Sequence, residues 1–91
     1  MASGTIKMPS ITNGRILNSG DLNDLKGSEN AGFYYVQTGV NNAPQAWTWL
    51  LVMGGTGTVQ LLFSQNRIYL RAYTGNPLAW TNWTNILLQP L

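Results

Sequence analysis

The hydrophobic pattern is clearest between residues 58 and 73, where two alternating segments flank Gln65 and Asn66 and predict a β-hairpin with a two-residue turn. The opposed pairs that follow are Ser64/Arg67, Phe63/Ile68, Leu62/Tyr69, Leu61/Leu70, Gln60/Arg71, Val59/Ala72 and Thr58/Tyr73. One face of the hairpin then carries only apolar side chains, and we expect it to pack into a core. The other face carries Arg67, Tyr69, Arg71 and Tyr73, and we expect it to meet a partner.

Two further segments have the composition of strands. Residues 32–38 are aromatic and β-branched between two glycines, and residues 46–53 are almost continuously apolar, so we expect the second strand to be covered on both faces. Residues 86–88 predict a short terminal strand. With the hairpin, this pattern indicates a mainly β domain, a small antiparallel sheet of four main strands; α+β is the alternative class.

The N-terminal part of the chain has a different character. Residues 1–18 hold isolated apolar positions among small and polar residues, and we expect an extended arm that precedes a single domain over residues 19–91. At the start of this domain, Ser19 or Asp21 can cap a short helix of one or two turns that ends at Gly27 and buries leucines.

Composition removes most catalytic chemistry. The 91 residues include no cysteine, which excludes disulfides and thiolate metal sites, and no histidine, which removes the usual general base and the commonest metal ligand. Asp21, Asp24 and Glu29 could in principle supply the two carboxylates of a glycoside hydrolase, but two of them occupy helix-cap positions. We therefore expect no catalytic residues, no metal and no cofactor.

Charge narrows the possible partners. Charged residues form 9% of the chain, against about 25% in an average soluble domain, and charge is depleted in interface cores. We expect the chain to associate with copies of itself. The five cations are dispersed, which argues against nucleic acid, and no apolar run approaches the roughly 18 residues of a membrane span. The first ten residues lack a secretory signal, which leaves synthesis in the cytoplasm.

The four tryptophans form two pairs. Trp47 and Trp49 share one face of an apolar strand and are interpreted as core or subunit-interface residues. Trp80 and Trp83 are three residues apart in an irregular segment, which can place both rings on one side. Their neighbours are Thr and Asn residues, as on a sugar-binding surface; the alternative is that the rings pack down on the sheet.

Gln60 and Arg71 are predicted to face each other across the hairpin. A hydrogen bond between the Gln60 amide oxygen and the Arg71 guanidinium would satisfy both groups under a cover of aromatic rings. We interpret this pair as structural.

An ordered set of short segments resembles the knob domain of phage and pyocin tail fibres over residues 21–88. The segments are Asp21-Leu22-Asn23, Gly32-Phe33-Tyr34-Tyr35-Val36, Asn42-Ala43-Pro44, Gln60, Ile68-Tyr69-x-Arg71 and Trp80-x-x-Trp83. The resemblance implies a small, non-enzymatic, β-rich knob that assembles as a homotrimer on a fibre or baseplate appendage, and residues 1–18 would then end a fibre shaft. Gln60, Arg71, Trp80 and Trp83 would be signature positions. Leu78-Ala79 departs from the pattern, since a smaller, more polar residue is expected before the first tryptophan.

The expected function is attachment to bacterial surface polysaccharide or lipopolysaccharide from a virion tail fibre, made in the host cytoplasm and released by lysis. The candidate receptor contacts are Arg67, Tyr69, Tyr73, Asn76, Trp80, Asn82 and Trp83. The alternative is a structural connector that joins other tail-fibre segments and makes no receptor contact.

Overall fold

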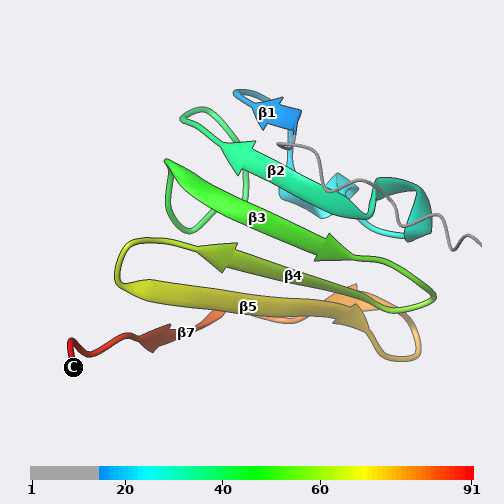
Figure 1. The fold of residues 1–91 in the computed structure, drawn as a ribbon. Helices are drawn as coiled ribbons and strands as arrows, with labels where there is room; N and C mark the ends of the chain where they lie inside the picture. Colours follow the sequence, from blue (N-terminus) through cyan, green and yellow to red (C-terminus); the bar gives the residue numbers. More distant parts are fainter. Residues whose placement is uncertain (1–14) are drawn as a thin grey trace, which may run out of the picture.

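The computed structural model describes residues 15–91, and residues 1–14 of the predicted arm lie outside the described residues. The elements in chain order are β1 (Arg15–Leu17), the 3₁₀ turns η1 (Leu22–Asp24) and η2 (Ser28–Asn30), β2 (Gly32–Val36), β3 (Thr48–Met53), β4 (Thr58–Phe63), β5 (Arg67–Thr74), β6 (Ala79–Trp80) and β7 (Thr84–Leu87). They form one sheet in the order β1-β2-β3-β4-β5-β6, and β7 also pairs with β5 (Figure 1). Only the β1–β2 pairing among these is parallel. The prediction of a mainly β domain with a small, mostly antiparallel sheet is confirmed.

The hairpin formed by β4 and β5 has the predicted register. Every pair from Phe63/Ile68 to Thr58/Tyr73 is observed. At the turn, the Ser64 backbone N–H donates to the Arg67 carbonyl at 2.9 Å, so Gln65 and Asn66 are the two loop residues. The hairpin occupies the middle of the sheet, with β3 on one side and both β6 and β7 on the other.

The core lies on the face of the hairpin that the sequence analysis assigned to a partner. Gln60 and Arg71 are buried at 0% and 5% exposure, and the core cluster consists of Leu22, Tyr34, Val36, Leu50, Val52 and Leu62. The opposite face, predicted to be the core, has no buried residue in β4 or β5. The prediction was wrong because η1 and the segment carrying β6 fold behind the sheet, where the polar side chains of β4 and β5 bind them (Figure 1).

The predicted N-terminal helix is reduced to the single 3₁₀ turn η1. Asp21 caps it by accepting the Asn23 backbone N–H at 2.8 Å, and Leu22 is fully buried. The Leu22 N–H donates to the Asn41 carbonyl at 3.0 Å, so the backbone at the start of the turn is tied to the loop after β2. The N–H of the first residue of a helical turn has no partner within the turn, and the Asn41 carbonyl satisfies it here.

The Gly54-Gly55-Thr56-Gly57 segment forms the connection between β3 and β4. Gly54 lies directly against the backbone carbonyl of Gly27, and a Cβ at this position would overlap that oxygen. Close approach of two backbones is a position that only glycine fills. It lets the η1–η2 segment pack against the end of the sheet.

Candidate functional site

A buried hydrogen-bonded network joins β4, β5 and the η1 segment. The Gln60 amide nitrogen donates to the carbonyl of Leu22 at 2.8 Å, which also accepts the Leu25 N–H, and to the carbonyl of Leu25, the C-cap of η1, at 3.0 Å. Its amide oxygen accepts the Arg71 Nε–H at 2.9 Å. Gln60 therefore uses both ends of its side chain to fasten η1 to the sheet, and the predicted contact with Arg71 is confirmed.

The Arg71 guanidinium lies between two indole rings. Its Cζ is 3.9 Å from the centroid of the Trp80 ring and 4.6 Å from that of Trp83, both within cation–π range. Nη1 donates to the Asn23 Oδ1 at 2.8 Å, whereas Nη2 has no hydrogen-bond partner among the described residues. Burial lowers the pKa of Arg71 to about 10 and the nearby Asp21 carboxylate opposes this shift, so the guanidinium remains charged at neutral pH.

The two tryptophans also bind the backbone of the covering segments. Trp80 Nε1 donates to the Asn23 carbonyl at 3.3 Å, and Trp83 Nε1 donates to the Asn42 carbonyl at 2.9 Å. Both rings thus stand on one side of Arg71's strand, as their spacing suggested. Their role in the fold is to close the network of Gln60, Arg71 and Asn23.

Asp21 sits at the rim of this network. Its Oδ1 accepts the Asn23 backbone N–H at 2.8 Å and the Asn42 Nδ2–H at 2.7 Å. These two hydrogen bonds, with the charge of Arg71, hold the pKa of Asp21 below its ordinary value of 3.8. The carboxylate is a cap, which is the interpretation made from its position in the sequence, and it also anchors the loop at Asn42.

This pKa shift predicts how stability depends on pH. Because the folded pKa of Asp21 is lowered, its contribution is complete above pH 4 and is lost as the pH falls through the folded value. We expect Asp21→Asn to flatten the acid limb of a plot of unfolding free energy against pH, measured by urea denaturation from pH 2 to 6. Asp24→Asn is the matched control, since no side-chain hydrogen bond of Asp24 is found among the described residues. An acid limb left unchanged by Asp21→Asn would contradict this account.

The predicted receptor contacts do not form one cluster. Tyr69 packs against the core and donates its hydroxyl to Gln45 Oε1 at 2.9 Å, and the Tyr73 ring lies 5.1 Å from that of Trp80. Arg67 is partly exposed and donates to Asn85 Oδ1 at 3.1 Å. Asn76 and Asn82 are exposed, in the turn after β5 and beside Trp83 respectively.

The sequence analysis did not single out Asn23 and Asn42 as individual site residues. Both appeared only within the ordered segments that carry the family resemblance. In the structure, Asn23 binds Arg71 and Trp80, and Asn42 joins Asp21 to Trp83. An asparagine in a loop gives no signal of its own, because its partners here are distant in sequence.

The sheet face opposite the core is apolar and uncovered by any described element; Figure 1 looks onto it. We call it the apolar face; its residues are Ile16, Phe33, Tyr35, Trp49, Leu51, Met53, Val59, Leu61, Phe63, Ile68, Leu70, Ala72 and Ile86. Trp49 stands on this face at 44% exposure, and Trp47 precedes β3 at 60%. Neither is a core residue of the single chain, so the core interpretation is wrong, and the subunit-interface interpretation stays a prediction.

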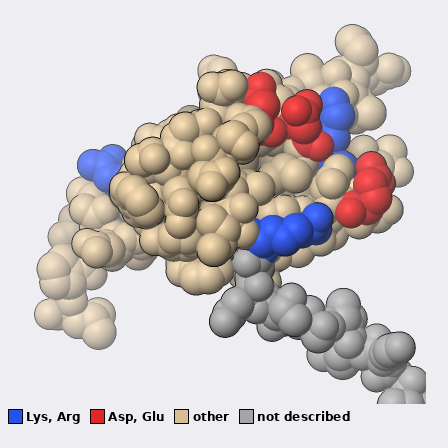
Figure 2. Space-filling view, turned by 90° about the horizontal axis from the view of Figure 1, so that it is seen from above, with Lys and Arg blue, Asp and Glu red and all other residues tan. Residues whose placement is uncertain are grey.

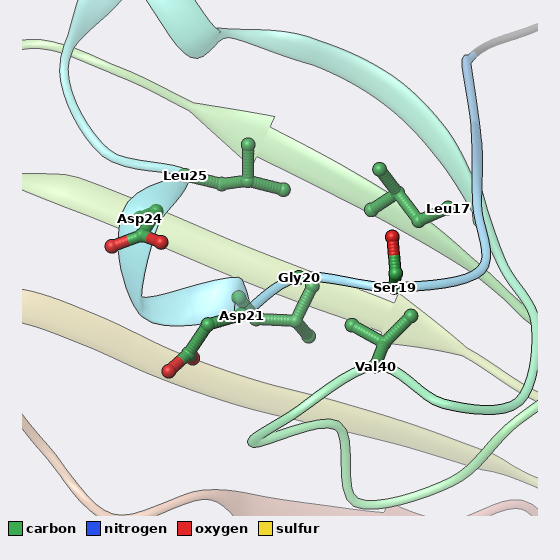
Figure 3. A pocket seen from close by; sticks show the side chains of 8 residues that line it. Leu17, Ser19, Gly20, Asp21, Asp24, Leu25 and Val40 are labelled. Carbon is green, nitrogen blue, oxygen red and sulfur yellow. The ribbon is translucent and has the colours of Figure 1, made fainter.

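A small pocket of about 190 Å³ opens on the other side of the molecule, beside η1 (Figure 3). It is lined by Leu17, Ser19, Gly20, Asp21, Leu22, Asp24, Leu25 and Val40. The side chains of Leu17, Leu25 and Val40 point inward, whereas the carboxylates of Asp21 and Asp24 point away from its centre. The side chains that point into the pocket are therefore mainly aliphatic.

Charge is sparse over the molecule's surface. Seen from the β1 edge, the acidic side chains gather on one side with a cation among them, and most of the remaining view is uncharged (Figure 2). Among residues 15–91, no group of three or more His, Cys, Asp or Glu side chains could hold a metal ion. No helix in the same part of the chain is long and apolar enough to cross a membrane.

The fold and site define a small β domain closed by a buried polar network on one face and left apolar on the other. Comparisons of the chain with protein-family models, with curated proteins and with solved structures gave no match.

Proposed function

We propose that this chain is a non-enzymatic attachment module of a phage or phage-like tail fibre, which works as a homotrimer and contacts bacterial surface glycan. The observation that carries the proposal is the convergence of the resembling segments. Residues of five of them, Asn23, Asn42, Gln60, Arg71 and the Trp80–Trp83 pair, meet in one network although they are spread over sixty residues of sequence. A shared set of side chains that closes a fold is what distant members of one domain family retain.

The network also divides the candidate receptor contacts into two groups. Tyr69, Tyr73 and Trp80 make internal contacts, and a glycan would have to compete with those contacts. Arg67, Asn76, Asn82 and the outer part of Trp83 remain available on the surface. We assign first contact with the glycan to Asn82 and Trp83, an exposed amide and a partly exposed aromatic ring that are adjacent in sequence.

Attachment through such a surface works by avidity. Three sites that each bind at about millimolar strength can together hold a cell surface tightly, because the second and third contacts form at high effective concentration. No catalytic residue is needed for this function. Low net charge also suits a protein that must approach a charged cell envelope without long-range repulsion.

The proposal is tested by binding of the labelled protein to a panel of bacterial strains. We expect at least one strain to bind it, binding to disappear after periodate oxidation of the surface glycan, and Asn82→Ala to weaken binding by about tenfold. Asn66→Ala, an exposed asparagine in the hairpin turn, is the matched control and should bind like the parent. Binding that survives glycan oxidation would contradict the glycan receptor.

A structural connector is the second candidate, favoured by the internal contacts of Tyr69, Tyr73 and Trp80, which leave fewer of the candidate receptor residues free on the surface. In that case no strain binds the protein, and the chain instead captures another tail protein specifically. The same panel, combined with pull-down against the purified parts of a tail, separates the two functions.

A further inference from the structure

Three rows of apolar side chains cross the sheet on the apolar face. The first runs from β1 to β7 through Ile16, Tyr35, Trp49, Phe63, Ile68 and Ile86. The second is Phe33, Leu51, Leu61 and Leu70, and the third is Met53, Val59 and Ala72. None of these residues carries a charge, and none is buried in the single chain. A strand that is apolar on both faces is normally covered on both.

We infer that the apolar face is the surface by which copies of this chain pack against one another. That three copies take part rests on the proposed function. The location of the contact rests on the rows themselves.

The size of the apolar face is that of an interface. With strands about 4.8 Å apart and about 3.3 Å per residue, β2 to β5 alone present roughly 400 Å² in projection. The accessible area is larger than the projection, because side chains stand up from the sheet. Single soluble chains rarely expose contiguous apolar patches of more than a few hundred Å², and one partner of a stable interface contributes roughly 800 Å².

The chemistry of the face favours a second copy over a different protein. A partner of another kind is selected largely by charges and hydrogen bonds at the contact, whereas the rows carry no charge and their polar groups are limited to the Tyr35 hydroxyl and the Trp49 indole N–H. Permanent interfaces between identical subunits are more apolar than transient interfaces between different proteins, and they resemble the core of a domain cut in half. The face also carries the aromatic residues that interface cores favour, including the Tyr35 and Trp49 rings, which touch at a centroid distance of 4.8 Å.

The end of the chain extends the same surface. All four residues of β7 are exposed, including Ile86 at 64% and Leu87 at 51%, so this edge strand is uncovered on both faces within residues 15–91. An exposed apolar edge strand invites association with another chain. In an assembly around an axis, β7 would lie beside the neighbouring copy and cover the margin of its apolar face.

One consequence is that the sheet face opposite the apolar face, which carries the network of Gln60 and Arg71, points away from the contact between copies. Residues on the two faces of one strand point in opposite directions, so a subunit contact through Leu61 and Leu70 leaves Trp83 and Asn82 at the periphery. These are the residues to which glycan contact is assigned above.

The inference is tested by thiol labelling, because the chain contains no cysteine. Leu70 on the apolar face and Leu78 in the turn before β6 have nearly equal exposure in the single chain, 42% and 44%. Leu70→Cys and Leu78→Cys are each treated with an uncharged maleimide over a range of protein concentrations, with circular dichroism as the check on folding. We expect the Leu70→Cys thiol to react at least tenfold more slowly at high concentration and to approach the Leu78→Cys rate on dilution.

Equal rates at every concentration would overturn the inference. The outcome is independent of receptor binding: protection of Leu70→Cys without attachment to any strain would leave the interface standing and remove the proposed function. Attachment to a strain without protection of the Leu70→Cys thiol would remove the inferred interface and leave the attachment function standing.

Discussion

Arg71→Ala is expected to lower the free energy of unfolding by about 3 kcal/mol, because it leaves buried polar partners without a donor and opens a cavity between two rings. Gln60 Oε1 and Asn23 Oδ1 each accept a hydrogen bond from this guanidinium, and Trp80 and Trp83 pack on its faces. Urea denaturation followed by tryptophan fluorescence measures the loss. For a domain of this size such a loss is a large part of the total stability.

Arg67→Ala is the control for this experiment. Arg67 lies on the same strand, is partly exposed and makes one described side-chain hydrogen bond, to Asn85, so its removal should cost less than about 1 kcal/mol. Similar effects of the two substitutions would contradict the structural role given to Arg71. A double-mutant cycle with Gln60→Ala should show a coupling of about 1 kcal/mol or more, since the two side chains share one network.

Trp83→Ala is expected to lower the free energy of unfolding by about 3 to 5 kcal/mol, the usual cost of truncating a packed tryptophan. Its ring covers Arg71 and packs against the core, and its Nε1–H holds the loop at Asn42. Trp47→Ala removes the same side chain at a site 60% exposed and should change the stability of the isolated chain by less than about 0.5 kcal/mol.

The same pair of variants bears on receptor binding. Loss of cell attachment in Trp83→Ala would be informative only where circular dichroism and the unfolding curve show that the fold survives. If Trp83→Ala were as stable as Trp47→Ala, the Trp83 ring would be a surface group. The claim that two tryptophans close the network around Arg71 would then be wrong.

Local pattern was sufficient for strands β2 to β5 and for the register of the β4–β5 hairpin, whereas β1 and the two-residue β6 were not predicted. Alternation around Gln65 and Asn66 aligned β4 and β5 pair by pair, and two glycines marked the ends of the segment that contains β2. These features depend on neighbours within a few residues. The three-residue strand β1 was missed because its partner, β2, lies at a distance along the chain and a short segment has no pattern of its own.

The faces of the hairpin could not be assigned in the same way. Buried residues are mostly apolar, but apolar residues also occur on protein surfaces. This chain has enough of them to line both faces of the sheet, so their presence on one face does not identify the core. What decides the outcome is the contact of Gln60 with the carbonyls of Leu22 and Leu25 and of Arg71 with Asn23, at sequence separations of 35 to 48 residues. The pairing of Gln60 with Arg71 was predictable from the register; the segment that covers them was not.

The uncovered apolar face agrees with the low content of charged residues in the sequence. If copies pack through the apolar face as inferred above, the apolar rows are hidden from water and the opposite side of the sheet stays in contact with it. The same division would suit a fibre tip, whose subunits meet at an axis and whose outer surfaces vary with the receptor.

The solution mass of the protein, measured by light scattering over a wide range of concentrations, tests the central claim most directly. We predict a mass of three chains at micromolar concentrations and above, and a mass of one chain for Leu70→Glu, while Leu78→Glu remains a trimer. A single-chain mass for the unmodified protein at every concentration would contradict both the homotrimer and the role of the apolar face.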